Sequence, residues 1–255
     1  MAIAYKNLAI LYKDMAQWDQ AIDAFEHSLA ALEEADDEHT LAIISNDLGF
    51  LHKDRENWEE AGACFQRSLK IFERMDDVPG MTSTLNSLGF LYTDKQDWGQ
   101  AAEYFQRSLE IAEHAGDQRG MANTLNYLGL LYTDKGDWEQ ADTSFQRSLA
   151  LFEQVGDERR RAAVFNNLGL LYKRQGDLEK AIEYVQRNLS ILERIQDTVN
   201  VARIMYDLAL LYEDLARYDE AVALLENVVD IRERLDHPAL AKSKETLENL
   251  KEKAR

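Results

Sequence analysis

Asparagine recurs at one position every 40 residues along this sequence, at Asn46, Asn86, Asn126 and Asn166. Each lies two residues before a recurring leucine, so its side chain is expected to point away from the core that a helix pair would form. A carboxamide offers donors and an acceptor, and it can pair with the N–H and C=O groups of an extended peptide. A row of such amides therefore predicts binding of a peptide backbone. A second interpretation stays open, in which each amide bonds the backbone of the neighbouring repeat.

Residues four, seven and eight positions after each asparagine fall on the same face of a helix. The position four residues on carries apolar side chains, Phe50, Phe90, Leu130 and Leu170. The other two positions carry hydroxyl or charged side chains, namely Lys53, Thr93, Thr133, Lys173, Asp54, Asp94, Asp134 and Arg174. The aspartates favour a ligand with basic side chains, whereas Lys173 and Arg174 reverse the sign of the charge toward the C-terminal end.

The other residues that could do chemistry form no catalytic or metal-binding pattern. The histidines show no His-x3-His spacing, and Cys64 is the single cysteine, expected to be buried in a helix. No Gly-x4-Gly-Lys-Ser/Thr loop, Gly-x-Gly-x-x-Gly turn or Gly-x-Ser-x-Gly turn occurs. We therefore predict that the chain is not an enzyme, has no catalytic residues, and needs neither a metal nor a cofactor.

The net charge of −18 limits the classes of partner. Binding to nucleic acid phosphates or to anionic membranes requires clustered lysine and arginine, so neither is expected. No run of 18 apolar residues occurs, and the N-terminus lacks the pattern of a secretory signal. These features predict a cytoplasmic protein whose partner is another protein or a peptide.

The elements that carry these residues repeat with the same period of 40. Leucine recurs at Leu8, Leu48, Leu88, Leu128, Leu168 and Leu208. In the fourth copy, apolar residues advance by three and four positions, which indicates two helices joined by a turn at 135–137. Asp137 with Gln140, Asp97 with Gln100, and Asn57 with Glu60 are expected to cap the second helices, and Gly116 and Gly156 to end them. Recurring arginines (Arg67, Arg107, Arg147 and Arg187) are predicted to pair between repeats with recurring glutamates such as Glu33, Glu73 and Glu153.

The run Leu125-x2-Leu128-Gly129-x2-Tyr132, followed by Ala141-x3-Phe145, resembles the tetratricopeptide repeat. The 40-residue length resembles the repeats of kinesin light chain and of several bacterial regulatory proteins. This resemblance implies an all-α fold, an α-solenoid in which six helix-turn-helix repeats and a C-terminal capping helix form a right-handed superhelix. It also implies that the first helices, with the asparagines, line a concave groove.

The repeat spacing gives the expected domain organisation. We predict a single solenoid domain over 1–255, with repeats at approximately 1–37, 38–77, 78–117, 118–157, 158–197 and 198–237, and a capping helix at 239–253. The N-terminal repeat has no such cap. Two interpretations of this open end remain: the chain is a piece of a larger protein, or the end pairs with another molecule to form a homo-oligomer.

Three functions are compatible with these patterns. The first is a protein–protein interaction module that binds an extended peptide in the concave groove. The second is the sensor or scaffold region of a larger signalling or regulatory protein. The third is a self-assembling repeat module, because each repeat buries its apolar face only against a neighbour.

Overall fold

The computed structural model describes residues 1–35 and 37–255, except for the side chain of Glu34. Within these ranges the chain is all-α, as predicted, and forms thirteen helices without a strand. Their bounds are α1 (Ala2–Asp14), α2 (Trp18–Ala35), α3 (Glu38–Asp54), α4 (Trp58–Arg74), α5 (Val78–Asp94), α6 (Trp98–Ala115), α7 (Gln118–Lys135), α8 (Trp138–Gln154), α9 (Glu158–Gln175), α10 (Leu178–Arg194), α11 (Thr198–Asp214), α12 (Tyr218–Arg234) and α13 (Leu240–Lys253).

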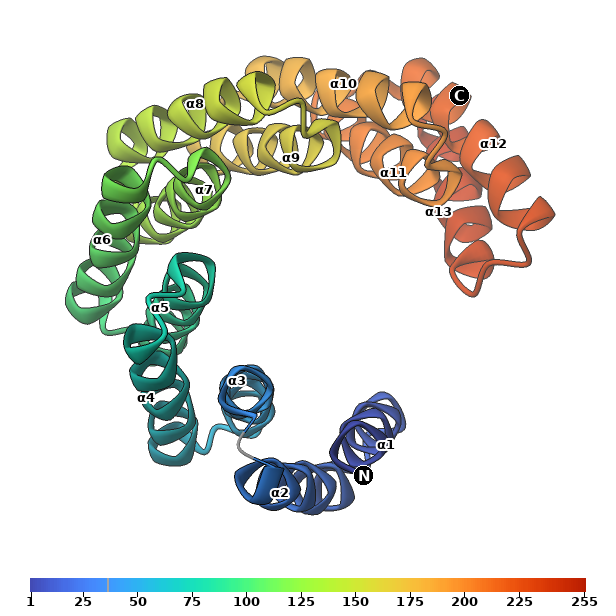
Figure 1. The fold of residues 1–255 in the computed structure, drawn as a ribbon. Helices are drawn as coiled ribbons and strands as arrows, with labels where there is room; N and C mark the ends of the chain where they lie inside the picture. The colour runs from blue at the N-terminus through green and yellow to red at the C-terminus, as the bar shows by residue number, and fades with distance from the viewer. Residues whose placement is uncertain (36) are drawn as a thin grey trace. The chain divides into compact units, whose positions relative to one another are not determined.

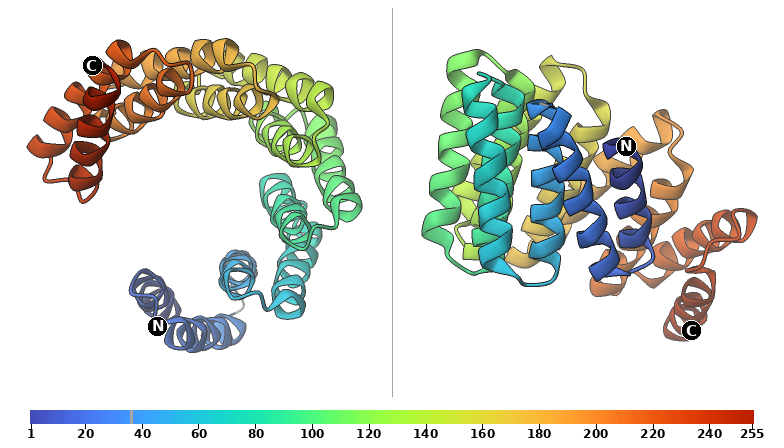
Figure 2. Two further views of the ribbon diagram at one scale, coloured as in Figure 1. Left: turned by 180° about the vertical axis from the view of Figure 1, so that it is seen from behind. Right: turned by 60° about the horizontal axis from the view of Figure 1, so that its bottom comes forward.

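Two compact units make up the chain, one over Met1–Leu131 and the other over Tyr132–Arg255, and each is described by itself. In the first unit, α1, α3 and α5 form one layer and α2, α4 and α6 form the other (Figures 1 and 2). In the second unit, α9 and α11 form one layer and α8, α10 and α12 the other. The odd-numbered helices are the first helices of the predicted repeats. Two expectations stay predictions: that a single solenoid domain spans 1–255, and that the superhelix is right-handed.

Aspartate side chains begin many of the helices. Asp97 accepts a hydrogen bond from the backbone N–H of Gln100 at 3.1 Å, and Asp137 accepts one from Gln140 at 3.3 Å. The prediction for Asn57 is wrong in one respect: it occupies the cap position of α4, but its side chain makes no cap hydrogen bond. A charged carboxylate accepts an N–H bond more strongly than a neutral carboxamide oxygen does. The turns at Gly116 and Gly156 do end the helices in the left-handed conformation, with φ of 68° and 70°.

Small residues let the two helices of a pair approach closely. Ala61, Ala101 and Ala181 are fully buried. A Cβ atom added to Gly89 on α5 would lie 2.5 Å from Cε1 of Phe105 on α6, and Gly49 stands in the same relation to Phe65. Glycine at this position therefore makes room for the phenylalanine of the second helix, which fills the core between the pair.

Buried hydroxyl and amide groups connect neighbouring helices across the core. The Ser68 hydroxyl lies 3.2 Å from that of Thr84, and the Ser108 hydroxyl lies 3.0 Å from that of Thr124. In α10 the corresponding residue is Asn188, whose side chain is 2% exposed and whose amide donates to Oδ1 of Asn166 at 3.5 Å. Each of these contacts satisfies polar groups that burial would otherwise leave costly.

The C-terminal helix α13 covers the end of the last pair. It packs on α12 and buries Ser243, Leu247 and Leu250, while its charged residues are mostly exposed. The buried guanidinium of Arg232 on α12 donates to the Ser243 hydroxyl at 2.5 Å. Apolar contact and this hydrogen bond together give α13 the position expected of a capping helix.

Candidate functional site

The side chains predicted to bind a peptide lie on the odd-numbered helices, and we call this surface the first-helix face. Asn46 lies on α3, Asn86 on α5, Asn126 on α7 and Asn166 on α9. Asn86 is only 6% exposed, and its amide nitrogen donates to the Thr124 hydroxyl of α7 at 3.1 Å. The expectation that Asn86 offers its amide to a ligand is therefore corrected: this amide links two repeats, through a side chain rather than the backbone.

Asn46 differs from Asn86 because it lines an open pocket. The pocket lies between α3 and α5, has a volume of about 320 Å³, and includes His39, Ile43 and Pro79 in its lining. Oδ1 of Asn46 is buried and has no hydrogen-bond partner. An unpaired acceptor of this kind favours a ligand that brings an N–H group, because an unmet hydrogen bond is costly in a buried place.

A half-buried carboxylate accompanies Asn46 in this pocket. Burial raises the pKa of Asp47, and the Lys6 ammonium, 3.4 Å from the carboxylate, acts in the opposite direction. On the other side of the pocket, Nε2 of His39 lies 3.3 Å from the Asp77 carboxylate. The pocket thus combines apolar walls with several hydrogen-bond acceptors.

The second unit has a comparable pocket between α9 and α11. It has a volume of about 260 Å³ and is lined in part by Asn166, Leu170, Lys173 and Asp207. Burial raises the pKa of Asp207, whose carboxylate lies 3.5 Å from the Arg203 guanidinium. Three of the predicted residues therefore meet in one pocket, together with an aspartate that the prediction did not include.

The predicted apolar residues divide into two kinds. Phe50 and Phe90 pack edge-on against Phe65 and Phe105, with ring centroids 5.2 and 5.5 Å apart, so they are partly used by the core. Leu170 is 39% exposed, and Leu130 is half-buried. Among these four positions, Leu170 offers the largest apolar surface to a ligand.

The predicted polar column is largely occupied by contacts within the chain. Lys53 lies 2.6 Å from Asp94 and 3.6 Å from Asp54, and Arg174 lies 2.5 Å from Asp134. Lys173 pairs with Asp214 at 3.0 Å. The three aspartates are therefore already paired with cations.

The two threonines of this column face inward more than predicted. The Thr93 hydroxyl donates to the carbonyl oxygen of Gly89 in its own helix at 2.9 Å, and Thr133 is buried. The unexpected members of the face are Asp47 and Asp207, which are half-buried. Asp47 and Asp207 occupy the same repeat position, one residue after that of the asparagines, which the spacing of four, seven and eight residues does not cover.

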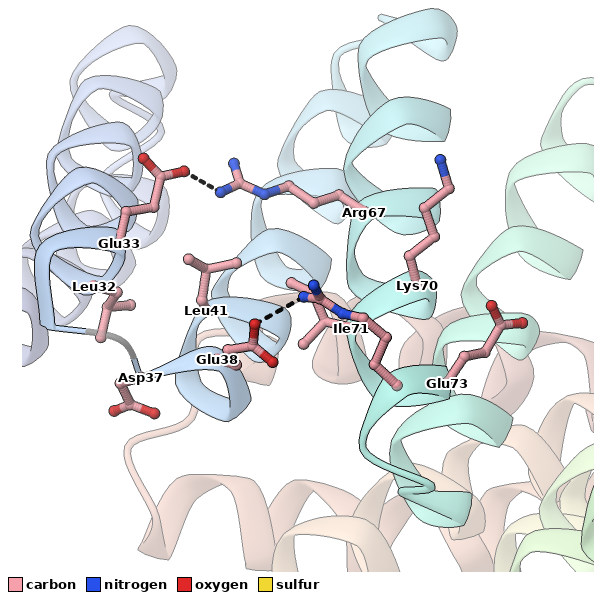
Figure 3. A pocket seen from close by; sticks show the side chains of 10 residues that line it. Leu32, Glu33, Asp37, Glu38, Leu41, Arg67, Lys70, Ile71 and Glu73 are labelled. Atoms are coloured by element: carbon pink, nitrogen blue, oxygen red, sulfur yellow. Dashed lines mark hydrogen bonds and ion pairs between the residues drawn. The ribbon is translucent and has the colours of Figure 1, made fainter.

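The even-numbered helices carry a second kind of pocket, which we call an outer pocket. The first one lies between α2, α3 and α4 and has a volume of about 780 Å³ (Figure 3). Arg67 on α4 pairs with Glu33 on α2, and Arg74 pairs with Glu38 at 2.9 Å. Arg107 and Glu73 lie 2.5 Å apart, so the predicted pairing between repeats is confirmed for Arg67 and Arg107. It is wrong for Arg187, which pairs with Glu183 of its own helix.

No metal-binding cluster accompanies these surfaces in the described ranges. No three histidine, cysteine or carboxylate side chains there come together as metal ligands. Burial raises the pKa of the Cys64 thiol to about 11, so the thiol stays protonated near neutral pH. None of the helices described is long and apolar enough to cross a membrane.

The tetratricopeptide repeat model matches residues 1–74, 39–114, 80–154, 120–194 and 160–234. This chain belongs to the tetratricopeptide repeat family. The match supports the repeat period and confirms the predicted membership. Proteins of this family are generally protein–protein interaction modules. No curated protein matches the sequence significantly.

Solved structures give further members with the same fold. BtubC (BKLC) from P. vanneervenii is 20% identical, with a TM-score of 0.71 and coverage of 89% of this chain and 92% of that one. A STAND protein with a tetratricopeptide repeat sensor, from Pyrococcus horikoshii, is 19% identical, with a TM-score of 0.72 and coverage of 98% and 38%. A Rap protein complexed with competence and sporulation factor is 17% identical, with a TM-score of 0.66 and coverage of 98% and 74%. At these identities the likeness shows the fold, an all-α solenoid.

Proposed function

We propose that this tetratricopeptide repeat chain binds an extended segment of a partner protein on its first-helix face. The observation that carries the proposal is the unpaired Oδ1 of Asn46 in an open pocket lined by acceptors and apolar side chains. A peptide N–H would satisfy this oxygen, and a carbonyl oxygen could accept from the amide nitrogen of the same residue. In the pocket of the second unit, Oδ1 of Asn166 already accepts from Asn188 at 3.5 Å, so the second lone pair of this oxygen and the amide nitrogen of Asn166 would contact the segment.

The charges of the face favour a segment with basic side chains. We assign the recognition of a basic side chain to Asp47 and Asp207, because each lines a pocket and is half-buried, with its nearest cation, Lys6 or Arg203, at 3.4 or 3.5 Å. Asp94 and Asp134 lie closer to their cations, at 2.6 and 2.5 Å. An arriving lysine or arginine would stabilise the charged form that burial disfavours at both carboxylates. Lys173, which lines the second pocket and pairs with Asp214 at 3.0 Å, would meet an acidic group of a segment bound in that pocket.

The net charge supports a protein partner and a cytoplasmic location. A chain with 47 acidic and 29 basic residues repels phosphate backbones and anionic lipid surfaces. Nucleic acid and membranes are therefore not among the proposed partners, and catalysis is not part of the proposed function.

Affinity capture from a lysate, followed by peptide arrays of each captured protein, tests the proposal. The wild type is compared with an Asn46→Ala/Asn166→Ala variant. The matched control is Asn86→Ala, whose amide is used between repeats. We expect the double variant to lose its partner and to keep its melting temperature, and the control to keep its partner with a lower melting temperature.

Retention of the same partner and peptides by the double variant would contradict the proposal. Loss of the partner on Asn86→Ala alone, at temperatures where that variant is folded, would move the ligand contact to α5. Peptides that bind should contain lysine or arginine, and their replacement by glutamine should weaken binding if Asp47 and Asp207 recognise them.

A second candidate is a sensor region in a larger signalling protein. The observation in its favour is the Pyrococcus horikoshii structure, in which a similar fold is the repeat sensor and this chain covers 38% of that protein. A native transcript whose reading frame continues beyond this sequence into another domain would support this function. A native protein of the mass given by these 255 residues would contradict it.

A third candidate is self-association through α1. Apolar side chains of α1 are exposed, among them Ile3, Leu8 and Leu11, the last at 58%. Their counterparts in α3, Leu48 and Leu51, are buried. Light scattering against concentration, with a Leu11→Glu variant as the control, decides the point: a wild type that stays monomeric at high concentration contradicts self-association.

A further inference from the structure

The second unit has an outer pocket between α8 and α10, with α9 beneath it. Its volume is about 850 Å³, and the buried side chains of Phe165 and Ile191 form part of its lining. Three arginines and two glutamates also line it: Arg161, Arg187, Arg194, Glu153 and Glu183. A third glutamate, Glu158, pairs with Arg161 at 3.2 Å and with Arg194 at 2.6 Å, so the charges around the pocket balance.

Arg161 is the residue that distinguishes this pocket. The same repeat position carries Leu41, Met81, Met121 and Val201 in the other repeats. Leu41 and Val201 are buried, so the position belongs to the apolar contact between repeats. At α9 the chain places a guanidinium there instead, which a requirement for stability alone would not favour.

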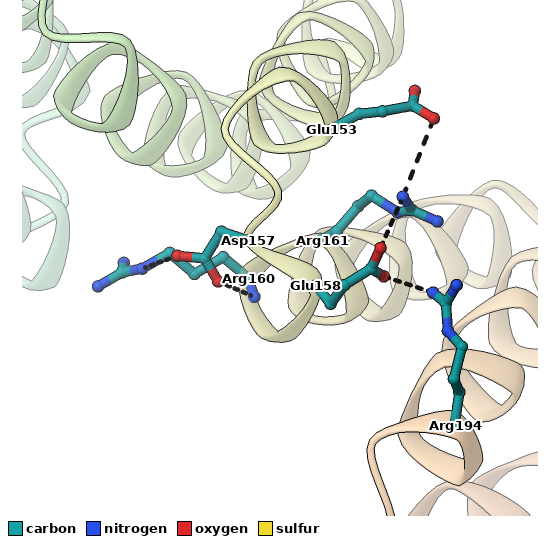
Figure 4. A network of polar contacts seen from close by, with 6 residues as sticks. All are labelled: Glu153, Asp157, Glu158, Arg160, Arg161 and Arg194. Atoms are coloured by element: carbon teal, nitrogen blue, oxygen red, sulfur yellow. Dashed lines mark hydrogen bonds and ion pairs between the residues drawn. The ribbon is translucent and has the colours of Figure 1, made fainter.

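The hydrogen bonds of Arg161 leave one edge of its guanidinium unused. Nη1 donates to Glu158 at 3.2 Å and lies 3.9 Å from Glu153, as Figure 4 shows. Nε is buried and has no hydrogen-bond partner. A guanidinium binds a carboxylate most strongly through two parallel N–H bonds, and the Nε edge is one of the edges suited to this geometry.

The ion pairs around the pocket also leave it open. In the first unit, Arg67 of α4 reaches Glu33 of α2 and so spans the outer pocket. The equivalent arginine of α10, Arg187, pairs with Glu183 of its own helix at 2.6 Å. Glu153 of α8 is therefore not held by α10, and its side chain is mostly exposed.

We propose that this outer pocket is a second interaction surface, which binds an acidic segment of a partner protein. A glutamate or aspartate of the segment would place its carboxylate on the Nε edge of Arg161, after a small shift of the side chains that cover it. Arg187 and Arg194 are paired with Glu183 and Glu158, each at 2.6 Å, so Arg161 supplies the contact with the carboxylate. Apolar residues of the segment would contact Phe165 and Ile191. The surface is formed by α8, α9 and α10 and needs neither of the first-helix pockets.

Arginine side-chain NMR gives a direct test, because each Nε–H group has its own resonance. The probe is a ten-residue peptide of alternating glutamate and leucine, and the control peptide carries glutamine in place of glutamate. We expect the glutamate peptide to shift the Arg161 Nε–H resonance and the glutamine peptide to leave it unchanged. Raising the salt concentration should weaken the binding.

Two variants complete the test. Arg161→Leu, which restores the residue of the second repeat, should weaken binding of the glutamate peptide at least about tenfold. Arg74→Leu, in the outer pocket of the first unit, should leave the affinity unchanged. Thermal melting verifies that both variants are folded. An unmoved Arg161 resonance at millimolar peptide, an equal response to the glutamine peptide, or unchanged affinity in Arg161→Leu would each overturn the proposal.

Discussion

The two outer pockets occupy equivalent positions in the second and fifth repeats, yet their contacts differ. In the first unit, Leu41 is 7% exposed and belongs to the apolar cluster, while Arg67 and Arg74 pair with Glu33 and Glu38 (Figure 3). In the second unit, Arg161 replaces the leucine and approaches Glu153 and Glu158, while Arg194 also pairs with Glu158 (Figure 4).

One of the two ion pairs therefore differs between the pockets. Arg194 pairs with Glu158 at 2.6 Å, as Arg74 does with Glu38, whereas Arg187 pairs with Glu183 of its own helix. Arg187 also lies against the rings of Phe165 and Tyr184, 5.9 and 5.5 Å from its guanidinium carbon. The comparison teaches that a position which the repeat period assigns to the core can carry a charged residue, with a local change of ion pairs, where one repeat departs from the others.

The largest effect is expected from placing the charge in the wrong pocket. Leu41→Arg should lower the free energy of unfolding by about 2–4 kcal/mol, because it removes buried apolar surface and because the nearby glutamates are already paired. Urea denaturation measures the change. A variant as stable as the wild type would show that the two pockets accept either residue.

The reverse change should have a smaller effect of the opposite sign. Arg161→Leu removes a buried donor without a partner and adds apolar contact, so we expect a gain of about 1–2 kcal/mol in the free energy of unfolding. The same denaturation experiment measures it. A loss of stability would mean that the pairs with Glu153 and Glu158 stabilise the fold, and it would weaken the comparison.

The half-buried aspartates extend the comparison to the first-helix face. Burial raises the pKa of Asp47 and of Asp207 above the ordinary 3.8, so the folded state holds protons on these carboxyl groups more tightly than the unfolded state does. The stability that this proton binding gives is fully present below pH 3.8 and is lost as the pH rises through the raised pKa. Asp207→Asn should thus stabilise the protein at pH 7 by less than about 1 kcal/mol, with the gain vanishing in acid. Denaturation at several pH values measures this, and Asp47→Asn should behave alike.

The smallest expected effect concerns the exposed ion pairs. A double-mutant cycle on Arg67 and Glu33 should give a coupling of about 0.2–1 kcal/mol. The same cycle on Arg187 and Glu153 should give none in the wild type, and a similar coupling once Arg161→Leu releases Glu153. Equal coupling of the two pairs in the wild type would contradict the rearrangement that we attribute to Arg161.

Much of the fold could be predicted because each repeat needs the same local interactions. The period of 40 gave the helix pairs, and Asp97, Asp137 and Gly116 gave the helix ends that the structure has. Asn57 failed as a side-chain cap although it occupies the cap position. Spacing identifies which residue stands at a helix start, but it does not show whether the side chain of that residue turns toward the free N–H groups.

The candidate site was less predictable, because helical spacing assigns a residue to a face without naming its neighbour on the next helix. Asn86 meets Thr124, 38 residues later, and its amide is used there. The residue 38 positions after Asn166 is Ile204, which has no polar side chain to offer. The residue 38 positions after Asn46 is again a threonine, Thr84, yet Oδ1 of Asn46 has no partner, so this comparison would have separated Asn86 from Asn166 but not from Asn46. Arg161 could have been found as the one charged residue in an apolar column.

The buried hydroxyls and amides bear on how near-identical repeats find the correct partner during folding. Repeats of one length and similar apolar faces could dock in the wrong order, which is a typical failure of tandem repeats. Ser68 meets Thr84, whereas Ser108 meets Thr124 and Asn86 joins it, and the fifth repeat pairs Asn188 with Asn166. A repeat docked one place out of order would leave some of these groups buried without a partner. The polar contacts thus favour the docking order of the repeats that the structure has.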